Sequence, residues 1–502
     1  MLELFSQGIT NVFAPFVLTM MFIGTIVGII FGAVPGLSSV MAIALFLPLT
    51  YGMDPGQGLS ILIALYIGSV SGGLISAILL KIPGTPASIA TCLDGHPMLD
   101  KNQGAKALGV GVVFSFIGTI ISIIALIFIA PYVAKIAIKF GPHEYFSIAV
   151  FSLMLIATLS TGSMVKGVFS GVLGFAFSTV GIAPVDAVRR FTFGSVELFD
   201  GFDILTVMIG LFAVSEVIKI AETSRLEGKT CVAKVDMNVK GFGFSIKEFV
   251  QQIPNGLRSS LIGLGIGILP GIGAGTSNLV SYTVAKNTCS EPEKYGQGCI
   301  DGIVASESAN NASVGGALIP LMTLGIPGDG VTALLLGAFM VHGIAPGPLL
   351  FVNYGNLVYT IFVACIVAAF MMLVTEFYGM RAFAKILKVP RHILLPIVFV
   401  FCVVGAFGLS SRVFDVWAVV VFGVIGYFFV KFKVPQAPFV IGFVLGTMAE
   451  TNLRRGLMMS EDSFSGFITN PISGMFLAAT VIFLVITIIK EIKNRRKMTN
   501  HA

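Results

Sequence analysis

The sequence predicts an all-α integral membrane protein with about 12–14 membrane segments in two homologous repeats, some of them broken or re-entrant helices. Three observations support this prediction. The 502 residues are 56% hydrophobic and only 11% charged, with a mean hydropathy of +0.96, whereas soluble chains carry about 25% charged residues. Apolar stretches long enough to cross a bilayer recur along the whole chain. A phrase interrupted by Gly and Pro also occurs once in each half.

The predicted membrane segments follow from the positions of the apolar stretches, since a spanning helix needs about 20 apolar residues. The long stretches are 12–34, 107–131, 145–161, 203–221, 356–375, 393–410, 413–430 and 472–489. Shorter or broken stretches are 37–51, 59–80, 165–184, 258–286, 302–326, 331–350 and 437–449. Glu3 rather than a basic run precedes the first stretch, which therefore reads as a first span and not as a cleaved leader.

The charged residues suggest how the segments are grouped. We expect a first transmembrane repeat over 12–222, a cytoplasmic linker over 223–257, a second repeat over 258–455 and a final helix over 471–490. Lysines and arginines concentrate between Lys219 and Lys247 and again between Lys490 and Lys497. Basic residues in short loops mark the cytoplasmic side, so both regions are predicted to lie there. Whether the repeats are inverted or parallel stays open, because it depends on the number of passes in each.

The repeated phrase is SVSGGLISAILLKIPG at 69–84 and SVGGALIPLMTLGIPG at 313–328. A second pair lies upstream, where GAVPG at 32–36 corresponds to GILPG at 267–271. Interrupted hydrophobic segments at matching places in two halves indicate the binding site of a transporter. Structural arrays also repeat, but with periods of about 20–50 residues and more than two copies. The pattern therefore favours transport.

The breaks at the end of the repeated phrase are candidate half-sites. Pro83 and Gly84 stop one helix, and a helix beginning at Thr85 would offer its amides and positive dipole end to an anion, with Ser88 beside it. The second copy has Pro327 and Gly328, followed by the carboxylate of Asp329. The alternative for either copy is an ordinary turn between helices.

The upstream breaks are also followed by small polar residues that suit a helix N-terminus. Their hydroxyl, amide and unwound carbonyl oxygens are candidates for substrate contact or for coordination of sodium. Close helix packing is the alternative role for the glycines in 263–275. The candidate residues are Gly36, Ser38 and Ser39 in the first half, and Thr276, Ser277 and Asn278 in the second.

A polar cluster leads directly into the second phrase. An ionisable residue within a membrane segment is a functional candidate, so Glu307 is predicted to bind a proton or cation. Asn310 and Asn311 could hydrogen-bond a carboxylated solute. The alternative is that Glu307 lies in a loop near the membrane interface.

Several function classes are disfavoured. The chain has no complete P-loop, no HExxH and no GxSxG motif, and its six cysteines and five histidines lack metal-ligand spacing. It is therefore not expected to be an enzyme or to hold a cofactor, and uphill transport would use an ion gradient or another subunit. The net charge of +6 gives no indication of nucleic-acid binding.

The run KIPGTPASIATCLDGHPM at 81–98 resembles the large membrane subunit of the tripartite tricarboxylate transporters, as do 267–277, 307–316 and GIPGD at 325–329. The resemblance implies a multi-pass carrier of the bacterial inner membrane. It also implies two partners, a small membrane subunit of about four spans and a periplasmic solute-binding protein. Transport in that family is secondary, driven by sodium or protons, and takes citrate-like tricarboxylates or related carboxylates.

We therefore expect a permease subunit that imports carboxylates by cation symport and alternating access, with Glu307 and Asp329 in ion coupling. The breaks hold few basic side chains, of which Lys81 is the nearest, so helix N-termini and co-transported cations would neutralise the substrate. The alternative is a channel, or a carrier for another small anion, that works without a binding protein.

Overall fold

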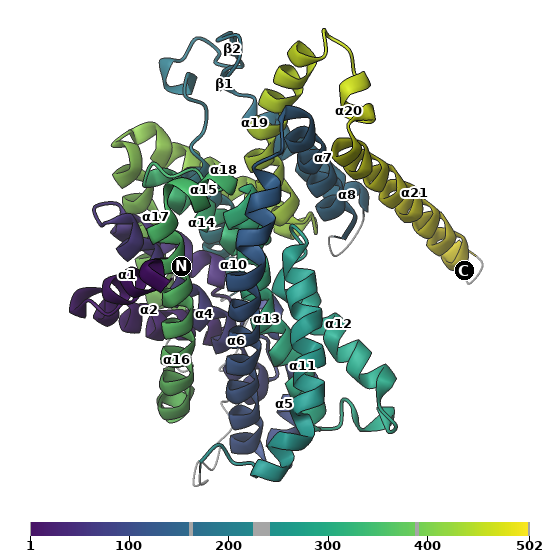
Figure 1. Ribbon diagram of the computed structural model, residues 1–502. Coiled ribbons are helices and arrows are strands. Elements are labelled where there is room, and N and C mark those ends of the chain that lie inside the picture. Colours follow the sequence, from purple (N-terminus) through teal and green to yellow (C-terminus); the bar gives the residue numbers. More distant parts are fainter. Residues whose placement is uncertain (1, 160–163, 224–240, 387–390, 500–502) are drawn as a thin grey trace.

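The computed structural model describes residues 2–159, 164–223, 241–386 and 391–499, and these are almost entirely helical (Figure 1). The prediction of an all-α integral membrane protein is confirmed. Within the described residues, seven helices are long and apolar enough to cross a membrane. They are Pro15–Ala33, Pro55–Leu80, Gly104–Ala137, Ile204–Glu222, Gly355–Gly379, Val413–Lys431 and Pro471–Ile489.

Most helices of the first half coincide with predicted apolar stretches, whereas α1 and α5 correspond to none of them. They are α1 (Leu2–Val12), α2 (Pro15–Ala33), α3 (Ser39–Phe46), η1 (Leu47–Thr50), α4 (Pro55–Leu80), η2 (Pro86–Ser88), α5 (Thr91–Asp100), α6 (Gly104–Ala137), α7 (Pro142–Leu159), α8 (Met164–Ser178), β1 (Gly181–Ile182), β2 (Arg189–Arg190), η3 (Val196–Leu198), α9 (Ile204–Met208), η4 (Ile209–Val214) and α10 (Ser215–Thr223). The six-residue η4 is a π-helix between α9 and α10.

The second half is helical throughout its described part. Its elements are α11 (Ile246–Ile268), α12 (Gly273–Thr288), η5 (Pro292–Lys294), α13 (Ile300–Leu324), α14 (Gly330–Val341), α15 (Pro348–Asn353), α16 (Gly355–Ile386), α17 (Arg391–Ser410), α18 (Val413–Lys431), α19 (Gln436–Met459), α20 (Ser465–Thr469) and α21 (Pro471–Thr499). Because α11 begins at Ile246, the helix starts inside the segment expected as a linker. Residues 224–240 of that segment lie outside the described residues.

Four helix breaks occur where the sequence predicts them. Val34 and Leu269, which end α2 and α11, are extended, and Gly36 and Gly271 after them have positive φ angles. Lys81 and Gly325, which end α4 and α13, are left-handed. Glycine and proline at these points disfavour continuation of the helix. The expectation of a helix beginning at Thr85 holds only for the three-residue η2, since α5 begins at Thr91.

The helix pairs α2–α4 and α11–α13 pack through corresponding glycines. A Cβ added to Gly32 would collide with the Ser69 carbonyl oxygen and approach Gly72. A Cβ added to Gly267 would lie 2.6 Å from the Ser313 carbonyl oxygen and 3.1 Å from Gly316 Cα. Both pairs therefore bring backbones together at the first residues of the repeated phrase. The division into two repeats itself stays a prediction.

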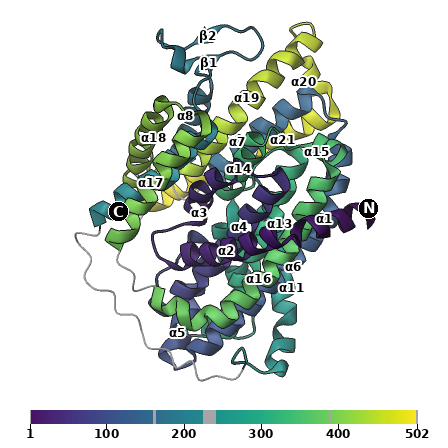
Figure 2. The same cartoon turned by 90° about the vertical axis from the view of Figure 1, so that its left-hand side faces the viewer.

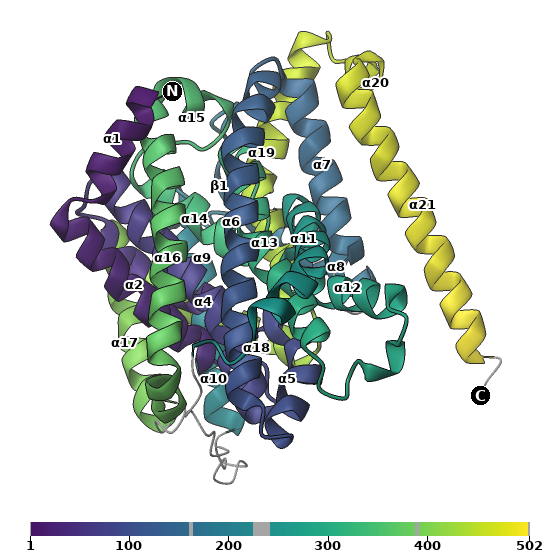
Figure 3. The same cartoon turned by 60° about the horizontal axis from the view of Figure 1, so that its bottom comes forward.

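The remaining helices surround these pairs. In Figure 3, α1 and α2 lie at one edge of the molecule and α21 at the other, where it packs against α7. The strands β1 and β2 pair antiparallel, with Gly181 opposite Arg190, and their hairpin projects beyond α8 and α18 on the side where α19 and α20 also end (Figure 2). The longest described helix, α6, packs along α13 and contacts α16. The helix α13 is thus enclosed, and its residues from Gly302 to Thr323 are buried.

Candidate functional site

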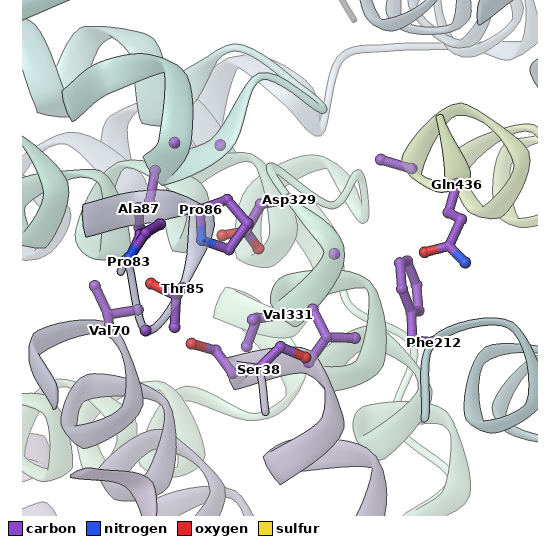
Figure 4. Close-up of a pocket in the computed structure, with 18 of the residues that line it drawn as sticks. Ser38, Val70, Pro83, Thr85, Pro86, Ala87, Phe212, Asp329, Val331 and Gln436 are labelled. Carbon is purple, nitrogen blue, oxygen red and sulfur yellow. The ribbon is translucent and has the colours of Figure 1, made fainter. Parts of the chain in front are cut away.

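All four helix breaks line one cavity of about 580 Å³. The chain contributes residues 36–40 after α2, 83–87 and Ile89 after α4, 271–275 after α11, and 329–331 after α13. Phe212 and Gln436 lie on the side of the cavity opposite Thr85 and Ser38 (Figure 4). Segments separated by almost 300 residues of sequence therefore meet at a single concave site.

The first-half candidates Gly36, Ser38 and Ser39 line this cavity. Ser38 is the N-cap of α3, and its Oγ accepts a hydrogen bond of 3.1 Å from the Met41 amide. The positive φ of +94° explains the glycine at position 36, because the chain turns there between α2 and α3. The α3 amides are thus directed toward the cavity wall, with one of them already satisfied by Ser38.

Pro83, Gly84 and Thr85 line the cavity beside them. A Cβ on Gly84 would collide with the Gly32 carbonyl oxygen, so the two first-half breaks touch through backbone. Thr85 is 4% exposed, and its hydroxyl has no hydrogen-bond partner among the described residues. Ser88 does not line the cavity; its hydroxyl donates to the Thr85 carbonyl oxygen at 3.0 Å. Thr85 is therefore the hydroxyl of this break that remains available to a ligand.

The N-terminus of α12 forms another wall, through residues 271–275. This helix has no side-chain cap, so its first amides and its positive dipole end are offered to the cavity. The predicted Thr276, Ser277 and Asn278 follow but are not in the lining. The Ser277 hydroxyl donates to the Ala274 carbonyl oxygen at 2.8 Å, and the Asn278 side-chain oxygen accepts from the Ala90 amide at 2.8 Å. The Ser277 hydroxyl also contacts the Ala309 carbonyl oxygen of α13 at 3.3 Å, so Ser277 and Asn278 connect α12 to its neighbours.

Asp329 lines the cavity as the N-cap of α14. Its Oδ1 accepts from the Thr332 amide at 2.8 Å, and its Oδ2 accepts from the Tyr66 hydroxyl at 2.7 Å. Pro327 and Gly328 are buried behind it, and the Gly328 carbonyl oxygen accepts from the Gly271 amide at 2.7 Å. The two second-half breaks are therefore joined by a backbone hydrogen bond, and both Asp329 oxygens have donors.

Glu307, Asn310 and Asn311 lie inside α13 and outside the cavity lining. All three are 0% exposed, so the alternative of an interfacial loop does not apply to Glu307. Its carboxylate accepts hydrogen bonds from Thr91, from Ser115 at 3.1 Å and from Asn311 at 3.4 Å. Asn310 donates to the Val70 carbonyl oxygen at 3.4 Å. The cluster thus stands directly behind Val70, which lines the cavity.

The structure adds residues that the sequence did not identify. Lys219, expected in a cytoplasmic loop, lies in α10 and lines the cavity together with Glu216, to which it is ion-paired at 2.9 Å. Gln436 donates to the Leu211 carbonyl oxygen at 2.8 Å, beside the π-helical turn. Lys81 is exposed and outside the lining. The sequence signal that could have indicated this position is that Lys219 lies at the amphipathic end of the apolar stretch 203–221.

Asp94 of α5 has a structural role. Asp94 is 0% exposed, and its Oδ1 accepts from the amides of Gly296, Gly298 and Cys299 at 2.9, 2.8 and 3.0 Å. Its Oδ2 accepts from the Tyr282 hydroxyl at 2.8 Å. Asp94 therefore fastens α5 to the loop between α12 and α13, and it does not face the cavity.

Comparison with known proteins gives a family match and two relatives. Residues 18–441 match the family model described as Tripartite tricarboxylate transporter TctA family. An "uncharacterized 52.8 kDa protein in TAR-I ttuC' 3'region" of Agrobacterium vitis is 32% identical over 491 residues, which are 98% of this chain and 97% of the relative. An "uncharacterized protein in TAR-II ttuC' 3'region" of the same organism is 33% identical over 231 residues, 46% of this chain and 96% of the relative. No solved structure matches the chain.

Proposed function

The chain belongs to the tripartite tricarboxylate transporter TctA family and is a membrane component of a transporter; from this premise, we propose that it is the permease subunit that imports tricarboxylates or related carboxylates by cation symport. Its proposed partners are a small membrane subunit of about four spans and a periplasmic solute-binding protein, and its proposed location is the bacterial inner membrane. The family match supports a role in transport, and the cavity supports an anionic solute.

The observation that supports a carboxylate is the convergence of four helix breaks on one cavity. Helix N-termini are anion sites, because their first amides lack intrahelical partners and the dipole is positive there. The first three residues of the uncapped α12 and the two residues before it line the cavity, and Thr85 adds a hydroxyl that has no partner among the described residues. Broken helices that direct half-helix N-termini at an anionic group are typical of secondary carriers.

The charges around the cavity support cation symport. Its described lining contains one basic side chain, Lys219, and two acidic ones, Glu216 and Asp329. A di- or trianion entering this site adds negative charge to a lining whose formal charges already sum to less than zero. Dipoles alone contribute at most about 2 kcal/mol per helix end. A cation that travels with the solute, either sodium or a proton, would restore the balance.

The test is uptake of labelled carboxylates into membrane vesicles with the cognate binding protein added. Citrate and a dicarboxylate are compared, each under a sodium gradient and under a proton gradient. We expect saturable uptake that requires the binding protein and collapses when the driving gradient is dissipated. Uptake that rises linearly with concentration, and that depends on neither gradient nor binding protein, would establish the channel alternative instead.

A further inference from the structure

The core contains a second buried carboxyl group, Glu376 of α16, that the cavity does not include. Glu376 is 0% exposed. Its Oε2 accepts one hydrogen bond, from the Ser71 hydroxyl at 2.8 Å, and its Oε1 has no partner among the described residues. A buried carboxylate without a positive partner is strongly disfavoured, so such a group either carries a proton or holds a cation. Glu376 is thus a functional candidate.

Glu376 and Glu307 are connected through one short segment of α4. Val70 lines the cavity, and its carbonyl oxygen accepts from the side-chain amide of Asn310, one turn after Glu307. The next residue, Ser71, donates to Glu376. The two carboxyl groups therefore belong to one polar centre directly behind the cavity wall.

This centre has unused oxygen ligands, and no described Lys, Arg or His side chain is ion-paired with its carboxyl groups. The side-chain oxygens of Asn310 and Asn311 are buried and without partners among the described residues, although the Asn311 amide contacts the Glu307 carboxylate. Neither Glu307 nor Glu376 forms an ion pair with a Lys, Arg or His side chain that the structure describes. Cys92 of α5 is a further titratable neighbour of Glu307, and a thiol brings no positive charge in either protonation state.

Asp329, the other predicted coupling residue, differs in this respect. Its two oxygens accept from Tyr66 and from the first turn of α14, whose positive dipole end compensates its charge. Its carboxylate is satisfied without any added ion. The buried carboxyl groups that lack a compensating positive charge are thus Glu307 and Glu376, and not Asp329.

We propose that Glu307 and Glu376, joined through Asn310, Val70 and Ser71, form the centre at which the coupling cation binds, separately from the solute cavity. The cation is monovalent, a proton or sodium, and the inference rests on the proposed symport. Since Val70 faces the cavity while its backbone and its neighbour Ser71 bind the centre, a shift of α4 would affect both sites together. This is the physical link that coupling needs.

The binding half of the proposal is tested on the purified full chain by infrared spectroscopy of carboxyl groups. The probes are protons and sodium chloride, with choline chloride as the salt control. We expect a protonated-carboxyl band that disappears on alkalinisation, or on sodium addition if sodium is the ion, and that is reduced in Glu376→Gln. The exposed Glu293→Gln makes the same chemical change and leaves the band unaltered. A Glu376→Gln spectrum identical to that of the wild type would overturn the assignment.

Two further measurements keep coupling and folding apart. In proteoliposomes with the membrane potential clamped at zero, the driving force is either a pH difference of one unit or a tenfold sodium gradient. Each coupled cation then drives about tenfold accumulation of citrate. We expect Glu376→Gln to lose this accumulation while citrate counterflow stays; wild-type accumulation in the variant would refute the centre. Ser71→Ala keeps both carboxyl groups and is expected to change the midpoint of the band titration, and an unchanged midpoint contradicts the link. If the wild-type protein, reconstituted with its small membrane subunit and its binding protein, shows counterflow of neither citrate nor the dicarboxylate, the proposed function fails. The infrared result still decides on the cation centre.

Discussion

The packing of the break at Gly328 against α13 and the end of α11 can be tested by one added methyl group. In Gly328→Ala, the new Cβ would lie 2.6 Å from Ala317 Cα, 2.7 Å from Ala317 Cβ and 2.9 Å from the Gly267 carbonyl oxygen. The first distance is 0.8 Å short of the 3.4 Å at which ordinary contact begins. The obstructing atoms belong to backbone or to a side chain without rotamers, so the break itself must move. Overpacking of this kind costs about 1–3 kcal/mol.

The matched control is Gly265→Ala, where an added Cβ meets nothing within 4 Å. Gly265 lies inside α11, so alanine there should stabilise by about 0.5–1 kcal/mol. The two substitutions are therefore predicted to change stability with opposite signs. The measurements are the thermal unfolding midpoint of the purified protein and the initial rate of carboxylate uptake. The uptake rate should fall in Gly328→Ala, because Gly328 directly precedes Asp329 and Gly330 in the cavity wall. Equal unfolding midpoints for the two variants would refute the close approach of Gly328 to Ala317 and Gly267.

Three other predictions concern single side chains. Thr85→Val removes a buried hydroxyl that has no described partner, so the unfolding midpoint should not change. Carboxylate affinity should drop about tenfold or more, because the hydroxyl is proposed to bind the charged solute. Unchanged uptake kinetics would remove Thr85 from the site. Asn310→Ala should abolish uptake without loss of protein from the membrane, and normal uptake would contradict its role between cavity and cation centre. Asp94→Ala leaves three backbone amides without their acceptor and should destabilise the protein by roughly 3 kcal/mol or more. Asp100→Ala, at an exposed position of the same helix, should change stability by less than about 0.5 kcal/mol. Thermal unfolding midpoints in detergent distinguish the two variants.

Several parts of the candidate site could be predicted because they depend on local chain chemistry. Glycine and proline stop a helix wherever they stand in a long apolar run, so the breaks at 34–38, 81–85, 269–272 and 325–329 were visible in the sequence. Gly36, Ser38, Ser39, Pro83, Gly84, Thr85 and Asp329 accordingly line the cavity. The roles proposed for these residues stay predictions.

Other residues could not be assigned, because their partners come from distant helices. Ser277 and Asn278 follow a break as Ser38 does, yet they bind backbone groups of neighbouring elements and leave the cavity to the α12 amides. Lys219 was expected in a loop, whereas in the structure it lies in α10, directly after the π-helical segment, and lines the cavity. Glu376 stands just after an apolar stretch, and only the packing of α16 against α4 shows that it is buried beside Ser71.

The sequence by itself determined the membrane class, the helical content and the positions of the four breaks, since hydropathy and the restraints of Gly and Pro act within one segment. Tertiary structure alone decided which polar groups meet. In a bilayer, a polar side chain must find its partner on another helix or in a cavity, and that choice depends on how each helix is rotated and packed. The cavity at the four breaks and the burial of Glu307 and Glu376 are therefore properties of the packed bundle.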